Sequence, residues 1–153
     1  MSEKVAPIRG PSVVAEVGGP VDEFRVTLAL YGDNLNPEIV SQLLSCNPTD
    51  AHSKGERKGP RSPPFTGGAW LLTAEGKAPA SPSDAIESLL GRFPPDVGFW
   101  KGLNDDFKVQ LRIGIHTAGW NRGFHISPRA STMIAVTGAS IEFDLYFYGE
   151  HDV

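Results

Sequence analysis

The chain has 153 residues, of which 40% are hydrophobic and 21% charged, as in a globular domain that can bury a core of its own. Its net charge of −4 argues against a general nucleic-acid-binding protein, because such proteins usually present a basic surface. The single cysteine cannot form an intramolecular disulfide. No apolar run approaches the ~20 residues that span a bilayer, so we expect no membrane insertion.

Residues 1–20 are rich in glycine, proline and small side chains, a composition that favours a flexible arm. The alternative is an arm that adds a strand to the edge of a sheet. Because this segment lacks the unbroken apolar run of a secretory signal, we expect a cytoplasmic protein. Residues 21–150 are predicted to form a single α+β domain.

A first strand and a first helix are predicted directly after the arm. Apolar and polar residues alternate in Glu23–Tyr31, which is typical of a half-buried strand. Asn36 fits the N-cap of a helix, and Pro37 fits its first position, where a missing N–H costs little. The strand residues expected to point inward are Phe24, Val26, Leu28 and Leu30, and the apolar stripe of the helix is Ile39, Val40, Leu43 and Leu44.

The segment 47–68 has no hydrophobic periodicity and contains several prolines, which predicts a long loop. Long loops in compact domains tend to be functional or mobile. Basic residues in this segment, Arg57 and Lys58 among them, would bind an acidic surface if the loop is functional. The alternative is a solvated, mobile loop. A short strand is expected from Ala69, with Trp70 pointing inward.

The remaining elements are predicted from the same signals. Ser81–Pro82 and Ser127–Pro128 each mark a helix start, and Gly138 suits the end of the second of these helices. Strands are predicted over 106–116 and 140–149, where apolar and polar residues alternate. The side chains expected to face the core from these segments and from a short helix between them are Ile86, Leu89, Leu90, Phe93, Val97, Trp100, Leu103, Phe107, Val109, Leu111, Ile113, Ile115, Ile141, Phe143, Leu145 and Phe147.

Two parts of the chain share the order strand, loop, helix and strand, with helix entries at Leu35–Pro37 and Ile126–Pro128. We interpret them as two interleaved βαβ units; chance agreement of helix-entry residues is the alternative. The predicted fold is a ferredoxin-like two-layer sandwich with a four-stranded, mostly antiparallel sheet and helices on one face. The other face stays open to water or to a partner. Its polar side chains would be Arg25, Tyr31, Lys108, Gln110, Arg112, His116, Glu142, Asp144, Tyr146 and Tyr148.

No motif of a known catalytic or nucleotide-binding site occurs in the sequence, whether a glycine-rich phosphate loop, His-Glu-x-x-His, Gly-x-Ser-x-Gly or Cys-x-x-Cys. Cys46 ends an amphipathic helix, where a free cysteine is more often a small buried apolar residue than a nucleophile. The sequence therefore favours a protein that is not an enzyme and has no cofactor and no metal.

The stretch Gly114–Ser127 is the densest in potential ligand-binding side chains, with His116, Trp120, Arg122 and His125. A zinc site needs three or four ligands, but no cysteine or carboxylate lies between the two histidines. We interpret the stretch first as a connection between a strand and a helix, then as a contact surface, and last as an active site.

Several short motifs are similar to those of a bacterial family catalogued as domain-of-unknown-function family 4279. The motifs are the run "GDNLNPEIVSQLLSCNPTDAHSKGE" from Gly32, the Gly-x-Trp at Gly68–Trp70 and the final "DLYFYG". The similarity covers residues 23–149 and implies no catalytic residues. Small single-domain proteins of this kind are often proposed to act in bacterial defence or toxin–immunity systems.

The first functional hypothesis is a non-enzymatic protein-binding domain, an immunity or regulatory protein that acts through its open sheet face or its basic loop. The alternative is a small-ligand-binding protein or an enzyme that uses loop 114–127. A third hypothesis is self-association through the free sheet face or an edge. The residues predicted to bind a partner or ligand are Arg112, His116, Trp120, Arg122, His125, Tyr146, Tyr148, Arg57 and Lys58.

Overall fold

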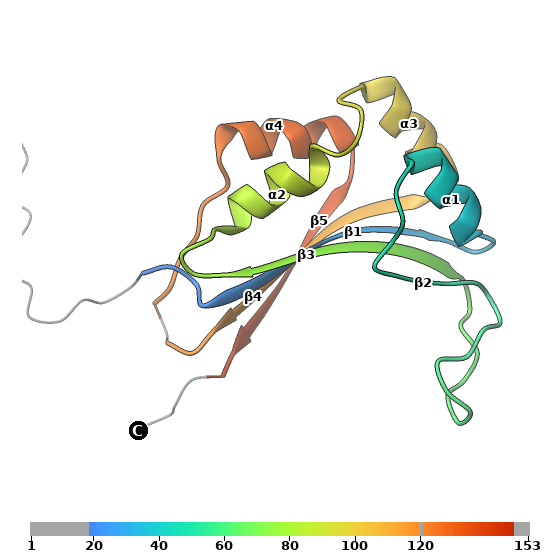
Figure 1. The fold of residues 1–153 in the computed structure, drawn as a ribbon, viewed down its shortest axis with the longest axis horizontal. Coiled ribbons are helices and arrows are strands. Elements are labelled where there is room, and N and C mark those ends of the chain that lie inside the picture. Colours follow the sequence, from blue (N-terminus) through green and yellow to red (C-terminus); the bar gives the residue numbers. More distant parts are fainter. Residues whose placement is uncertain (1–18, 120, 149–153) are drawn as a thin grey trace, which may run out of the picture.

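The computed structural model describes residues 19–119 and 121–148 of the chain. Four helices lie on one face of a five-stranded sheet, and the described residues place no helix on the other face (Figure 1). The predicted arm lies outside the described residues except for its last two, of which Pro20 forms a parallel bridge with Gly123. None of the helices in the described part of the chain is long and apolar enough to cross a membrane.

The sheet is mixed. Its strands are β1 (Glu23–Gly32), β2 (Asp50–His52), β3 (Gly68–Lys77), β4 (Lys108–Thr117) and β5 (Ser140–Phe147), in the order β2-β3-β1-β4-β5. The pairs β2–β3, β3–β1 and β1–β4 are antiparallel, whereas β4 and β5 are parallel. Strand β1 is therefore the centre of the sheet, and β2 and β5 are its edges.

The helices are α1 (Pro37–Leu44), α2 (Pro82–Leu90), α3 (Val97–Asp106) and α4 (Pro128–Thr137). Helices α1, α2 and α4 begin at the prolines predicted from the sequence. Side chains at the N-caps accept a backbone N–H in every case, and proline follows the cap in α1, α2 and α4. Helix α4 ends at Gly138, whose φ of 65° is the left-handed conformation that glycine adopts without strain. The cap residues are Asn36, Ser81, Asp96 and Ser127.

The α+β class and the helical layer on one face are as predicted, but the four-stranded, ferredoxin-like duplication is not confirmed. The predicted first unit joined β1 to β3, and these strands are antiparallel neighbours. The difference arises because residues 50–52, inside the expected loop, form β2, which runs in the direction of β1, and the chain then reverses before β3 begins. Strand β5 is a fifth strand, placed parallel to β4 at the edge.

The core lies between the helices and the strands β3, β1 and β4, with which the helices make their main contacts. The predicted inward residues of β1, β4 and α2 are buried, as are Trp70, Trp100 and Leu103. Helix α1 buries only Val40 and Leu44 of its predicted stripe, because it presents a narrower face to β3. The predicted inward residues that are instead exposed are Ile39, Leu43, Val97, Ile141, Phe143, Leu145 and Phe147.

Candidate functional site

The open face of the sheet contains a hollow of about 660 Å³, lined by side chains from all five strands. In β1 and β4 the residues that line it alternate with the buried core residues. The sequence pattern therefore places these side chains on the face away from the helices. This hollow is the candidate site.

Side chains of neighbouring strands bind one another on the floor of the hollow. Arg25 of β1 lies opposite Glu75 of β3, and their charged groups are 2.7 Å apart. Thr27 and Thr73 are the next opposed pair, and their hydroxyl groups form a hydrogen bond of 2.8 Å. Cross-strand pairs of this kind stabilise a sheet and hold the side chains in fixed positions.

Arg112 of β4 joins three strands across the hollow. Its guanidinium group donates to the Tyr31 hydroxyl on β1 at 3.3 Å and lies 3.5 Å from Glu142 and 3.4 Å from Asp144, both on β5. The hydrogen bond to Tyr31 raises the pKa of Arg112, partial burial opposes this, and Asp144 adds to the rise. The arginine therefore stays charged, and one cation faces two carboxylates.

His116 and Gly114 complete the β4 side of the hollow. The ring of His116 stacks on Tyr146 of β5, with centroids 4.6 Å apart and an angle of 15° between the planes. Gly114 lies opposite Arg25 in the sheet and has no side chain, so the floor of the hollow is open at this position. A Cβ at position 114 would meet only atoms of Arg25, at 3.7 Å and beyond. Arg112, His116 and Tyr146, three of the predicted contact residues, are thus brought together.

Tyr148 lies at the end of β5, outside the hollow. Its backbone N–H donates to Thr117 of β4 at 3.0 Å, and its side chain is about half exposed. Desolvation, followed by the charges of Glu23 and Asp22, raises the pKa of the Tyr148 hydroxyl above its ordinary value.

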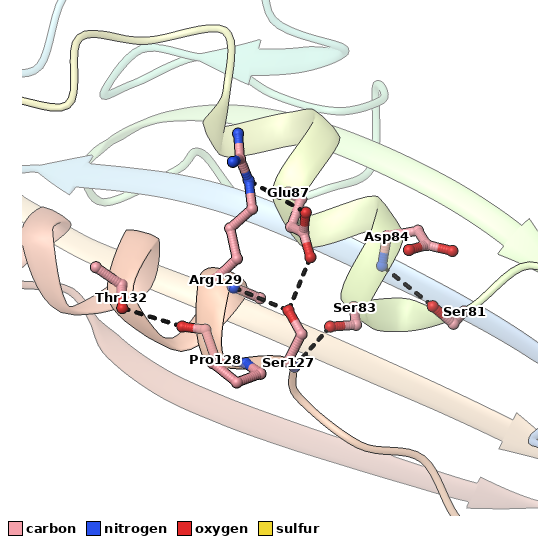
Figure 2. Close-up of polar contacts among 9 residues, drawn as sticks. Ser81, Ser83, Asp84, Glu87, Ser127, Pro128, Arg129 and Thr132 are labelled. Carbon is pink, nitrogen blue, oxygen red and sulfur yellow. Dashed lines mark hydrogen bonds and ion pairs between the residues drawn. The ribbon is translucent and has the colours of Figure 1, made fainter.

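Arg122 and His125, also predicted in stretch 114–127, do not line the hollow. Arg122 and His125 are exposed in the connection to α4, and Trp120 lies outside the described residues. Figure 2 shows how the end of this connection is fastened to α2: the Ser127 N–H donates to Ser83, and the Ser127 hydroxyl donates to Glu87 at 2.7 Å. The structure thus gives this part of the stretch a structural role as a connection.

The basic loop is ordered by contacts of its own. Arg57 donates to the Ser62 carbonyl oxygen at 2.6 Å, and both Arg57 and Lys58 are exposed. The ring of Phe65 stacks on His52 at 3.5 Å, at the point where the loop leaves β2. In Figure 1 the loop extends from the β2 edge on the side away from the helices. Neither Arg57 nor Lys58 lines the hollow.

Sequence reasoning did not name five residues of the hollow: Leu71, Thr73 and Glu75 of β3, and Thr49 and Asp50. Thr49 and Asp50 lie just before and at the start of β2, which has only three residues and so cannot show a period of two. The run Asn47-Pro48-Thr49 was a turn signal, but it carries no information about which strand follows or pairs with it.

The arrangement is suited to binding more than to covalent chemistry. The hydroxyl groups of Thr27 and Thr73 on the floor bind each other, and the ring of His116 is stacked on Tyr146. Among the described residues, no group of three or more histidine, cysteine or carboxylate side chains is placed to hold a metal ion. The hollow therefore offers fixed charges, hydrogen-bonding groups and an aromatic surface.

Comparison with known proteins gives one match. The model of a domain of unknown function, DUF4279, matches residues 22–148, from the start of β1 to the end of the described chain. No curated protein and no solved structure matches the chain. The match confirms the family resemblance seen in the short motifs, and it includes every strand of the hollow.

Proposed function

We propose that this chain, which belongs to the DUF4279 family, is a non-enzymatic protein-binding domain that holds its partner on the open face of the sheet. The observation that carries the proposal is the hollow around Arg112, on a face over which the described residues place no helix. In this proposal the protein works in the bacterial cytoplasm as an immunity or regulatory protein, the roles that the family resemblance suggests.

The side chains of the hollow are those that protein interfaces favour. Arginine and tyrosine are enriched among the residues that contribute most to binding, and Arg112, Tyr31 and Tyr146 gather here. The bonds of Arg112 to β1 and β5 fix its position before a partner arrives, so less side-chain entropy is lost on binding. Two carboxylates share this one guanidinium group, so the three side chains together carry a net negative charge. In this proposal the matching surface of the partner therefore presents basic groups.

The small-ligand alternative has less support. A pocket for a small molecule usually encloses most of its ligand among apolar side chains. The hollow is open to solvent and has charged groups at its centre. Among the described residues of the stretch 114–127, which that alternative invokes, only Gly114 and His116 line it.

The proposal is tested by capturing partners from a lysate with the wild-type chain and with the double variant Arg112→Ala, Tyr146→Ala. The matched control is Arg129→Ala, because Arg129 lies on the helical face and forms a comparable exposed ion pair with Glu87 at 3.3 Å. We expect a stoichiometric partner to bind the wild type and the control, and to bind the double variant at least about tenfold more weakly, since hot-spot residues cost more than ~1 kcal/mol each.

A partner that binds all three proteins equally would contradict the proposal. If binding is lost only when Arg57 and Lys58 are changed to glutamate, the basic loop is the contact surface instead of the open face. If no protein binds and a small molecule raises the melting temperature of the wild type but not of the double variant, the ligand alternative replaces the proposal.

A further inference from the structure

The edge strand β5 differs from the other long strands because its apolar side chains are largely exposed. Ile141, Phe143, Leu145 and Phe147 are 44%, 50%, 72% and 54% exposed, and the first three lie beside buried core residues of β4, on the helical side of the sheet. Phe143 also contacts Phe124, with ring centroids 6.3 Å apart. Natural edge strands are usually short or carry charges that prevent pairing with another chain. The opposite edge follows this rule, since β2 has three residues. Strand β5 has eight and carries charges only on its other side.

We propose that β5 pairs antiparallel with β5 of a second copy of this chain, which joins the two sheets into one. The backbone of the edge has the required orientation. The Tyr148 N–H donates to Thr117 of β4, so the N–H groups of even-numbered residues point toward β4. Those of Ile141, Phe143 and Leu145 then point to the free edge. Among the described residues, no strand lies beyond β5.

The charges of β5 select one register for this pairing. A two-fold axis at Phe143 would place Glu142 opposite Asp144 of the second copy, and an axis at Asp144 would place this residue opposite itself. Both arrangements oppose like charges, which destabilises a strand pair. With the axis at Leu145, Asp144 lies opposite Tyr146 of the second copy, and the carboxylates no longer meet.

This register also matches the remaining side chains. Leu145 faces itself, Phe143 faces Phe147 of the second copy, and Glu142 faces Tyr148 of the second copy. Aromatic pairs and aliphatic pairs directly opposite each other are favourable in antiparallel strands. The exposed apolar row of each copy is therefore covered by the same row of the other, as an isologous interface requires. Both helical layers lie on one side of the joined sheet, and both hollows lie on the other.

The first test is the mass in solution as a function of concentration. We expect the wild type to have twice the mass of the chain, and Leu145→Glu to have the mass of one chain, because two carboxylates would meet at the axis. The control is Leu43→Glu on α1, where the leucine is 52% exposed, and it should remain a dimer. An equimolar mixture of Leu145→Glu and Leu145→Lys should regain the double mass, which shows that the single variants fold.

The second test fixes the register by oxidation of single cysteines in a Cys46→Ser background. Leu145→Cys should form an intermolecular disulfide, because directly opposed Cα atoms lie about 5.5 Å apart. Phe143→Cys should not, since its two copies would be about 14 Å apart along the strands. A wild type that is monomeric up to its solubility limit, or a dimer that Leu145→Glu leaves intact, overturns the proposal. A disulfide at position 143 alone overturns the register.

These outcomes are separate from those of the proposed function. The side chain of Leu145 lies on the opposite side of the sheet from the hollow, so Leu145→Glu leaves the residues around Arg112 in place. A monomeric variant that still captures a partner would preserve the proposed function, and a wild-type dimer without a partner would preserve the dimer.

Discussion

Strands β4 and β5 are neighbours with the same alternation of apolar and polar residues, yet only one of them is part of the core. Ile113 of β4 is fully buried, whereas Phe143, directly beside it in the sheet, is half exposed. The difference comes from position. Strand β4 lies between two strands and contacts helix α3, while β5 lies at the edge, beyond the main helix contacts. An alternating pattern therefore shows that a strand has two different faces, but not that its apolar face is covered by the same chain.

The comparison is sharpest when a single side chain is shortened on each strand. Ile113→Ala should lower the free energy of unfolding by about 2–5 kcal/mol, because it leaves a cavity among fully buried residues. Leu145→Ala should change it by less than about 0.5 kcal/mol in dilute solution, since the leucine is already mostly in water. Chemical denaturation of both variants at low protein concentration measures the difference. Equal losses would mean that β5 is covered within the monomer.

The second prediction concerns helix α4, which connects the buried strand to the exposed one. Ser127→Ala should destabilise the protein by about 1–2 kcal/mol, because the hydroxyl both caps α4 and donates to Glu87 of α2 (Figure 2). Ser131→Ala, at an exposed position of the same helix, is the control and should have little effect. Thermal unfolding followed by circular dichroism tests both. If the two variants lose the same stability, the link to α2 contributes nothing.

On the open face, the two strands are joined by Arg112. Arg112→Met keeps most of the aliphatic stem but removes the ion pairs with Glu142 and Asp144. We expect a loss of at most about 1 kcal/mol that shrinks as salt is added, because these groups are partly exposed and therefore screened. Urea titrations at low and high ionic strength measure it. A large loss that is independent of salt would assign Arg112 to packing instead.

The smallest effect is expected at the end of β5. The pKa of Tyr148 is raised in the folded protein, first by desolvation and then by Glu23 and Asp22, so folding favours the neutral phenol. This contribution is present below the tyrosine pKa of an unfolded chain, about 10, and is lost as the pH rises through the higher folded value. An ultraviolet titration should show a late-titrating tyrosine in the wild type that is lost in Tyr148→Phe. A late titration that persists in the variant would assign it to another tyrosine.

Much of the fold could be predicted from local signals. The cap residues Asn36, Ser81 and Ser127, each followed by proline, located three helices correctly, because capping and the proline ring act within one turn. The alternation in β1 and β4 identified which side chains are buried and which lie on the open face. This is why Arg112, His116 and Tyr146 could be placed on one surface before their contacts were known.

The errors concern short or long-range features. Strand β2 was missed because three residues show no period. Without β2, the antiparallel relation of β1 and β3 was also missed, as was the part of the hollow that Thr49 and Asp50 form. In stretch 114–127, residue types that favour binding were found, but Arg122 and His125 lie away from the hollow. Composition records which side chains are present, but not whether they converge.

The sequence by itself determined where α1, α2 and α4 begin, where α4 ends, which face of each long strand is polar, and that one sheet face can stay open. These properties depend on neighbours within a few residues. Only the tertiary structure decided the order β2-β3-β1-β4-β5, and with it the edge position of β5 and the union of Arg112 with Tyr31, Glu142 and Asp144. The reason is physical: strand order depends on which long-range pairings satisfy backbone hydrogen bonds and bury the most apolar surface together, and no local pattern contains that information.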